Sequence, residues 1–312
     1  MSDKITRRDF IKGLAATGAA VYGLQAIDNL AYAQAKPDTQ LSVAQGNITI
    51  GSDPALIKRT TRQAVAALGG MGKFVSKGSV VIVKPNIAWS RTPEQVADTN
   101  PYVVEAVVEM CLEAGAKKVR VLDYAINPPQ ITYERSGIKA AVERASGSIE
   151  FADERKFKEK SIPQGKVLRS WTIYQDALDA DVLINLPIAK HHSLTRLTLG
   201  LKNIMGLIKD REAIHPQIDQ KLADLATVIK PHLIIMDAYR ILTANGPNGG
   251  TAKDIKLVGK MIAGTDPVAV DSYAATLFGL KGEDVGYIKA AYSMGLGEID
   301  LKKVKVQNVN VA

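Results

Sequence analysis

Short, continuously apolar runs that alternate with helix-forming segments are the feature that most restricts the fold of this chain. Residues 79–84 (Ser-Val-Val-Ile-Val-Lys) and 118–123 (Lys-Val-Arg-Val-Leu-Asp) flank a helical segment that begins at Asn100-Pro101 and ends near Gly115. The first of these is an apolar run, typical of a buried strand, and the second is predicted to be another strand. This strand–helix–strand unit predicts two parallel strands joined by a right-handed crossover.

The same arrangement recurs along the rest of the chain. Residues 182–186 and 233–236 are further apolar runs, and helices are predicted to begin at Asp53-Pro54 and Asp266-Pro267. In both helix starts the aspartate caps the first turn and the proline occupies it. The 312 residues are sufficient for one large domain with a buried core. We predict an α/β fold with a mostly parallel sheet flanked by helices, built as one lobe or two.

The N-terminus has the pattern of a twin-arginine signal peptide. Residues 6–12 (Thr-Arg-Arg-Asp-Phe-Ile-Lys) match the twin-arginine consensus, and an Ala/Gly-rich segment follows from Gly13 to about Ala26. Ala31-Tyr32-Ala33 offers small residues to a signal peptidase. The apolar run ends by Asp28, so it is shorter than the roughly 20 residues that a membrane span needs.

These observations divide the chain and predict where it goes. We expect the translocation machinery of the twin-arginine route as a partner, a periplasmic or extracellular location, and no stable membrane span after cleavage. The predicted parts are a signal peptide (1–33), a linker (34–40) and a single α/β domain (41–312).

Charge and cysteine content argue against several classes of function. The formal net charge is +8, but the basic residues are spread along the chain, whereas a nucleic-acid-binding protein concentrates them. We therefore expect no nucleic acid as a partner. The one cysteine, Cys111, lies in an apolar helical pattern, so neither an internal disulfide nor a cysteine-ligated iron–sulfur cluster is expected.

Polar residues follow four of the predicted strands at the points where they end. These are Lys84-Pro85-Asn86, Asp123, Lys190-His191-His192 and Asp237. In open parallel sheets, ligands bind beyond the carboxyl ends of the strands. A single polar strand end simply meets water, but four together predict a shared site.

The segment after residue 193 predicts an anion-binding helix face. Counted as one helix from Leu194, its apolar residues fall on one stripe, and Thr195, Thr198 and Lys202 share a second face. Two hydroxyls and an ammonium suit a small anion, although a solvated polar face has the same pattern. The glycine-rich loop at 245–250 could cradle an anion with its amides, or it is a simple turn.

Histidines and aspartates supply candidates for proton transfer or metal binding. His191 could act as a general base or as a metal ligand. Together with Asp123 and Asp237 it could hold a divalent cation, although no spacing motif supports this. Asp271 is surrounded in sequence by apolar residues, where an ordinary surface carboxylate is not expected.

Several of these segments resemble the DUF362 family. The resemblance runs from about Val80 to Gly297, and its most specific parts are Leu201-Lys202-Asn203 with Gly206, and the Asp-Pro-Val-Ala-Val-Asp run at 266–271. The motifs also include Val83-Lys84-Pro85-Asn86, Lys190-His191, and Gly246-Pro247 with Gly249. The family has no established general activity. Many members carry a ferredoxin-type domain with cysteine-ligated clusters, which is not expected here because the sequence has one cysteine.

The resemblance increases the weight of the lysine, asparagine, histidine and aspartate candidates without giving them roles. The favoured hypothesis is an exported enzyme that acts on a small carboxylate or phosphate, and the alternative is a non-catalytic protein that binds a metal or metabolite. The cofactor is unknown. The predicted catalytic residues are His191, Lys190 and Asp271; the predicted substrate-binding residues are Lys84, Asn86, Thr195, Thr198, Lys202, Asn203, Gly246 and Gly249; and the predicted metal ligands are Asp123 and Asp237.

Overall fold

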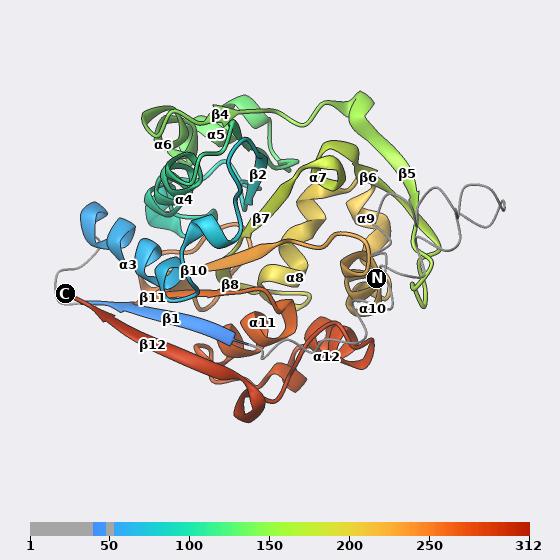
Figure 1. Ribbon diagram of the computed structural model, residues 1–312. Coiled ribbons are helices and arrows are strands. Elements are labelled where there is room, and N and C mark those ends of the chain that lie inside the picture. Colours follow the sequence, from blue (N-terminus) through green and yellow to red (C-terminus); the bar gives the residue numbers. More distant parts are fainter. Residues whose placement is uncertain (1–39, 48–52) are drawn as a thin grey trace, which may run out of the picture. The chain divides into compact units, whose positions relative to one another are not determined.

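A ten-stranded, mostly parallel sheet is the centre of the computed structural model, which describes residues 40–47 and 53–312 (Figure 1). The predicted signal peptide lies outside the described residues, as does all of the predicted linker except Gln40. The main path of the sheet has the order β12 (Lys305–Val311), β1 (Gln40–Gly46), β11 (Ile255–Gly264), β10 (Leu233–Leu242), β7 (Val182–Leu186), β2 (Val80–Pro85), β3 (Lys118–Val121) and β4 (Ser148–Ile149).

Parallel pairing connects β10, β7, β2, β3 and β4, whereas β11 runs antiparallel to both of its neighbours. The predicted β2–β3 pair is therefore confirmed. Off the main path, β8 (Ile188–His192) pairs with β10 and with β9 (Arg196–Thr198). A separate two-stranded sheet consists of β5 (Phe157–Ser161) and β6 (Ser170–Tyr174).

Helices cover both faces of the sheet, which is why its central strands are continuously apolar. In β2, Val81 and Val83 belong to one hydrophobic cluster, and Ile82 between them belongs to the other. The strands β7 and β10 divide their residues in the same alternating way. On the first face lie α3 (Pro54–Ala66), α4 (Pro101–Glu113), α5 (Pro129–Arg135) and α6 (Ile138–Arg144); on the second lie α8 (Gly200–Asn203), α10 (Ile218–Ala226), α11 (Pro267–Thr276) and α12 (Gly286–Ser293).

Two short helices complete the fold, α7 (Gln175–Asp179) and α9 (Arg211–Ile214). The three predicted helix starts are confirmed. Asp53, Asn100 and Asp266 each accept a hydrogen bond from a backbone amide of the first turn. None of the helices in the described part of the chain is long and apolar enough to cross a bilayer.

The predicted continuous helix over 194–208 is wrong. Residues 196–198 form β9, which turns back along β8, and the chain is helical only from Gly200. Arg196 adopts a left-handed conformation (φ 64°) and Leu199 an extended one, and both interrupt a helix. The apolar spacing was misleading because a short strand and a short helix bury their residues against the same core.

The predicted end of the fourth strand is also wrong. Asp237 does not follow β10 but lies within it, because β10 continues to Leu242. The ends of β2 and β3 and the segment after β7 still meet at one edge of the sheet, as the parallel order requires.

Candidate functional site

A pocket of about 1160 Å³ opens at the carboxyl ends of β2 and β3, beside β8 and α8. Its size is suited to a small molecule. Seven side chains that the sequence singles out line it, namely Lys84, Asn86, Asp123, Lys190, Thr198, Lys202 and Asn203.

Lys84 and Asp123 form a buried ion pair on the floor of this pocket. The Lys84 Nζ lies 3.0 Å from Asp123 Oδ1, and both side chains are almost fully buried. The other carboxylate oxygen of Asp123 accepts a hydrogen bond from the amide of Ile87 (2.7 Å). Burial lowers the pKa of Lys84, and the Asp123 charge opposes that effect. The charge of Lys84 is therefore balanced within the protein.

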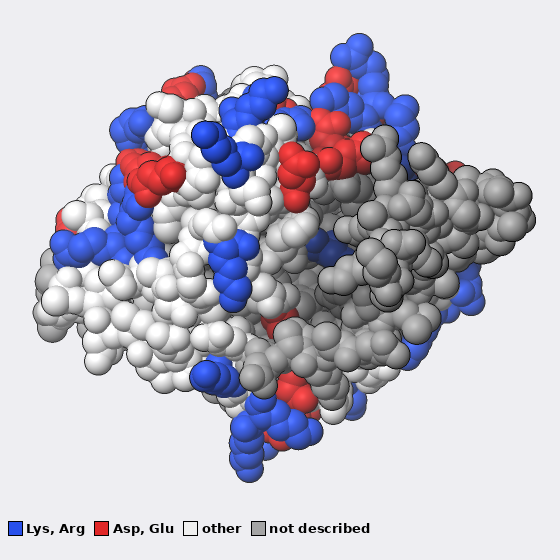
Figure 2. Space-filling model, viewed as in Figure 1, with Lys and Arg blue, Asp and Glu red and all other residues white. Residues whose placement is uncertain are grey.

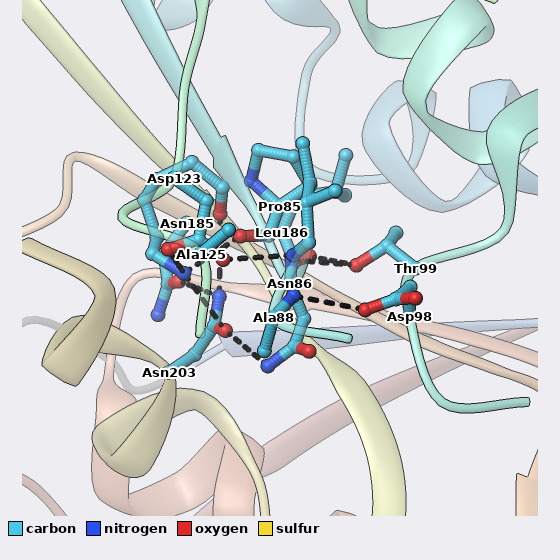
Figure 3. A network of polar contacts seen from close by, with 12 residues as sticks. Pro85, Asn86, Ala88, Asp98, Thr99, Asp123, Ala125, Asn185, Leu186 and Asn203 are labelled. Atoms are coloured by element: carbon cyan, nitrogen blue, oxygen red, sulfur yellow. Dashed lines mark hydrogen bonds and ion pairs between the residues drawn. The ribbon is translucent and has the colours of Figure 1, made fainter. Parts of the chain in front are cut away.

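Asn203 connects this ion pair to the neighbouring strands (Figure 3). Its Oδ1 accepts hydrogen bonds from Lys84 Nζ (3.1 Å) and Asn86 Nδ2 (2.9 Å). Its Nδ2 donates to Asn185 Oδ1 (2.8 Å) and to the carbonyl of Lys84 (3.2 Å). A buried amide with all these partners holds β2, β7 and α8 in one arrangement. We call Lys84, Asn86, Asp123 and Asn203 the paired network.

Gly206 allows the chain to approach this network closely. A Cβ atom at Gly206 would lie 1.7 Å from Asp123 Oδ1 and 2.6 Å from Lys84 Nζ. Non-bonded atoms do not approach a Cβ this closely in proteins, so the position accepts only glycine unless the ion pair moves. The Gly206 of the motif therefore has a steric reason in this fold.

Lys190 enters the pocket from β8 and is held by oxygen acceptors. Its Nζ donates to Asn86 Oδ1 (3.2 Å) and to the carbonyl of Ala97. Burial lowers the pKa of Lys190 to about 8, against the opposing charge of Asp98. Asp98 was not predicted from the sequence. Its Oδ1 accepts from the amides of Ala88 and Trp89, and burial raises its pKa to about 7.

Lys202 differs from the other two lysines of the pocket. Its side chain is buried, yet among the described residues its Nζ has one polar partner, the Met205 Sδ at 3.6 Å. Burial, together with the charges of Lys190 and Arg211, lowers the pKa of Lys202 to about 7. In the same pocket the buried Thr198 Oγ1 has no hydrogen-bond partner in the part of the chain that the structure describes.

Arg211, at the start of α9, is a pocket residue that was not predicted from the sequence. Its Nη2 donates to the carbonyl of Ala125 (3.0 Å), and its guanidinium lies 4.7 Å from the centre of the Tyr124 ring. No carboxylate forms an ion pair with Arg211 in the part of the chain that the structure describes. In the sequence Arg211 stands between two acidic residues, Asp210 and Glu212, a pattern typical of a solvated surface. We call Thr198, Lys202 and Arg211 the open group.

The two adjacent histidines have different surroundings. His191 does not line the pocket, and its Nδ1 accepts a hydrogen bond from the Gly246 amide (3.2 Å). His192 lines the pocket, and its Nδ1 accepts from the amides of Leu194 (3.1 Å) and Thr195 (3.4 Å). Burial lowers the pKa of His192 to about 3, so its ring is neutral. Because Nδ1 is an acceptor, the ring proton is on Nε2.

Two predicted site residues, Asp271 and Thr195, lie outside the pocket lining and form hydrogen bonds with the backbone. Asp271 is fully buried and accepts hydrogen bonds from the amides of Gly200 (2.7 Å) and Leu201 (2.8 Å), which stabilises the start of α8. Burial raises the pKa of Asp271 to about 7. Thr195 donates its hydroxyl to the carbonyl of Leu197 (2.9 Å) and also lies outside the pocket lining.

The glycine-rich loop packs against the segment that follows β2. The Gly246 amide is used by His191, and the Gly250 amide donates to the carbonyl of Gln95 (3.2 Å). A Cβ at Gly246 would lie 2.1 Å from the His191 carbonyl, and Gly249 has a left-handed φ of 98°. Pro247 lines the pocket, but Gly246 and Gly249 do not, so this loop does not form the predicted anion cradle.

Asp123 and Asp237, the predicted metal ligands, lie in different surroundings. Asp237 lines a small separate cavity with Asp98, and its carboxylate accepts from the amides of Asn100 (2.8 Å) and Tyr239 (3.1 Å). Within residues 40–47 and 53–312, no group of three or more His, Cys, Asp or Glu side chains is placed to hold a metal ion. The geometry therefore gives the predicted cation site no support.

Comparison with known proteins identifies the leader and the family. Residues 4–21 match the twin-arginine translocation pathway signal sequence, so the chain is exported by that route. A thylakoid-associated protein of Synechocystis is 28% identical over 245 residues, which cover 75% of this chain and 74% of that protein.

Two solved structures are similar at low sequence identity. A Thermotoga maritima protein matches at 13% identity and a TM-score of 0.44, over 73% of this chain and 59% of the other. The lactate racemase apoprotein of Thermoanaerobacterium thermosaccharolyticum matches at 13% and a TM-score of 0.43, over 81% and 59%. This chain therefore spans less than two thirds of either protein. Residues 81–276, more than half of the chain, match the domain of unknown function DUF362, and the protein belongs to that family.

Proposed function

We propose that this exported protein binds a small anionic compound, a carboxylate or a phosphate, in the pocket beside α8 and acts on it as an enzyme. One observation carries the proposal. Of the described residues that line the pocket, three buried ones are lysines and a single buried one, Asp123, is acidic. Asp123 is already paired with Lys84. Lys190 faces the charge of Asp98, which lies outside the pocket lining, but Lys202 and Arg211 have no carboxylate partner among the described residues.

The charge balance favours an anion over a cation or a neutral ligand. Acidic residues Asp210 and Glu212 are at the exposed rim, where water screens them. Lys190, Lys202 and Arg211 are buried or partly buried, so their attraction for a bound anion is screened much less. A bound anion would in turn raise the pKa of Lys202 and favour its ammonium form. Binding is therefore expected to take up protons above pH 7.

The surroundings of the pocket suit chemistry as well as binding. A neutral His192 has its ring proton on Nε2, and the Thr198 hydroxyl is without a partner within residues 40–47 and 53–312. Both groups can donate a hydrogen bond to an oxygen on which negative charge develops. Because the chain is exported, we place this activity in the periplasm or outside the cell.

Calorimetric titration with lactate and with inorganic phosphate tests the anion site. Arg211→Ala is expected to weaken the binding of the preferred anion at least tenfold, equivalent to about 1.4 kcal/mol. The matched control is Lys253→Ala, which removes an exposed cation outside the pocket lining and is expected to leave the affinity unchanged. If neither anion binds to the parent protein, or if both variants weaken binding equally, the proposed site is wrong.

Turnover distinguishes an enzyme from a protein that only binds. The parent protein is incubated with a mixture of small organic acids and phosphate esters, and the products are followed by mass spectrometry. An enzyme consumes at least one compound, and Arg211→Ala slows that consumption. Saturable binding without any product would favour the non-catalytic alternative.

A further inference from the structure

We infer that Lys202 is a nucleophile that forms an imine with the carbonyl carbon of a 2-oxo acid held in the pocket, an inference that rests on the proposed anion binding.

The contacts of the three pocket lysines distinguish Lys202 from the others. Lys84 is paired with Asp123 at 3.0 Å, and Lys190 donates to Asn86 and to a backbone carbonyl. Lys202 has only a thioether acceptor, a weak one, among the described residues. An amine held by strong acceptors stays protonated and turned away from a substrate. The weakly held amine of Lys202 can lose its proton and present its lone pair to the pocket.

The surroundings of Lys202 favour its neutral, nucleophilic form. The side chain is 9% exposed, and the neighbouring cations Lys190 and Arg211 repel a further positive charge. In the protein without ligand these conditions lower the pKa of Lys202 to about 7, so about half of the molecules carry a neutral amine at neutral pH. The carboxylate of a bound substrate raises this pKa, and the neutral fraction that remains is the form that attacks. Desolvation next to other cations is a recognised way of making a lysine nucleophilic.

The remaining pocket groups complete the requirements of the reaction. Arg211 has no carboxylate partner among the described residues and can bind the carboxylate of the substrate. Thr198 Oγ1 is buried and has no partner in the described residues, so it can donate to the carbonyl oxygen. A 2-oxo acid has the two matching functions on adjacent carbons, a carboxylate for the cations and a ketone for the amine.

The chemical step balances without a cofactor. The neutral Lys202 nitrogen attacks the carbonyl carbon, and the carbon–oxygen π bond opens to an alkoxide that takes one proton. The nitrogen loses one proton, which gives a neutral carbinolamine. The hydroxyl then takes one proton and leaves as water while the nitrogen lone pair forms the carbon–nitrogen double bond, and the nitrogen gives up its remaining proton to leave a neutral imine. No atom is oxidised or reduced, and water is the only product released.

Reductive trapping of the whole exported protein tests this inference. The protein is incubated with pyruvate and cyanoborohydride, which delivers a hydride to the imine carbon and fixes it as a secondary amine. Intact mass is expected to rise by the mass of pyruvic acid less one oxygen atom, and peptide mapping is expected to place the adduct on Lys202. Glyoxylate and 2-oxoglutarate are tested in the same way.

Two variants and one ligand make the outcomes distinct. Lys202→Arg cannot form the imine, so it is expected to lose the adduct. Lys253→Arg is expected to retain the adduct. Lactate has no ketone, so it reports on the anion site alone.

The results separate failure of the imine from failure of the anion site. Lactate binding without an adduct from any of the three oxo acids overturns the imine and leaves the anion site intact. An adduct spread over exposed lysines, or retained in Lys202→Arg, also overturns it. Failure of lactate, phosphate and the oxo acids alike to bind overturns the proposed function itself.

Discussion

The paired network and the open group lie in the same pocket but are built in opposite ways. In the paired network each charge or amide has close partners, with Lys84 and Asp123 in an ion pair and Asn203 bonded through both ends of its amide. In the open group, Thr198 Oγ1 has no partner and Lys202 has only a sulfur, among the described residues. Satisfied buried groups stabilise one arrangement of the fold, whereas unsatisfied ones destabilise it. The second set is therefore better explained by a ligand than by folding.

The largest effect is expected from disrupting the paired network with Gly206→Ala. The new Cβ would overlap Asp123 Oδ1 and press on Lys84, so the ion pair must separate. Breaking a buried ion pair typically costs about 3–5 kcal/mol, and we expect a loss of that size in the free energy of unfolding, measured by urea denaturation.

The matched control for this change is Gly72→Ala. Gly72 belongs to the short helix at Met71–Lys73, and a Cβ there meets no atom within 4 Å. The Gly72→Ala protein is therefore expected to be as stable as the parent protein. If Gly206→Ala is as stable as the parent protein, the paired network is not rigidly packed around Gly206.

A change in the open group is expected to have the opposite sign. Lys202→Met removes a buried charge that has no carboxylate partner among the described residues, and should stabilise the protein by about 4 kcal/mol near pH 7 while weakening anion binding. Urea denaturation without ligand measures the first effect, and calorimetry measures the second.

The stability gain should depend on pH in a defined direction. The pKa of Lys202 is about 7 in the folded state and near the ordinary value of 10.5 in the unfolded state. Between these values the unfolded state binds more protons, so the stability of the parent protein rises with pH. The advantage of Lys202→Met should therefore be constant below pH 7 and shrink towards pH 10.5. An advantage independent of pH would mean that Lys202 is not desolvated.

The sequence was sufficient for the fold and for most of the paired network. Helix starts at Asp53, Asn100 and Asp266 depend on local capping, and the buried strands depend on composition, so both can be read from short segments. The parallel order then brings Lys84, Asn86 and Asp123 together at the strand ends. Asn203 joined them only through the family resemblance.

Local sequence patterns were not sufficient to predict how the open group is assembled, because its three residues come from different elements of the fold. Thr198 and Lys202 do reach the pocket, but from a strand and a short helix instead of from one helix face. Arg211 reaches it from α9, and nothing in its local sequence distinguishes it from a surface residue. Asp237 shows the converse error, because only the tertiary pairing of β10 with β11 extends the strand past it.

The smallest effect is expected at His191, which the sequence favoured as a catalytic residue. His191→Ala removes one hydrogen bond, from the Gly246 amide to Nδ1, and should lower the free energy of unfolding by about 1 kcal/mol. Its side chain does not line the pocket, so lactate affinity should change by less than about threefold, or 0.6 kcal/mol. His192→Ala is the paired measurement, because that ring does line the pocket. If His191→Ala weakens binding more than His192→Ala does, the boundary between the site and its scaffold lies further out, at the 245–250 loop.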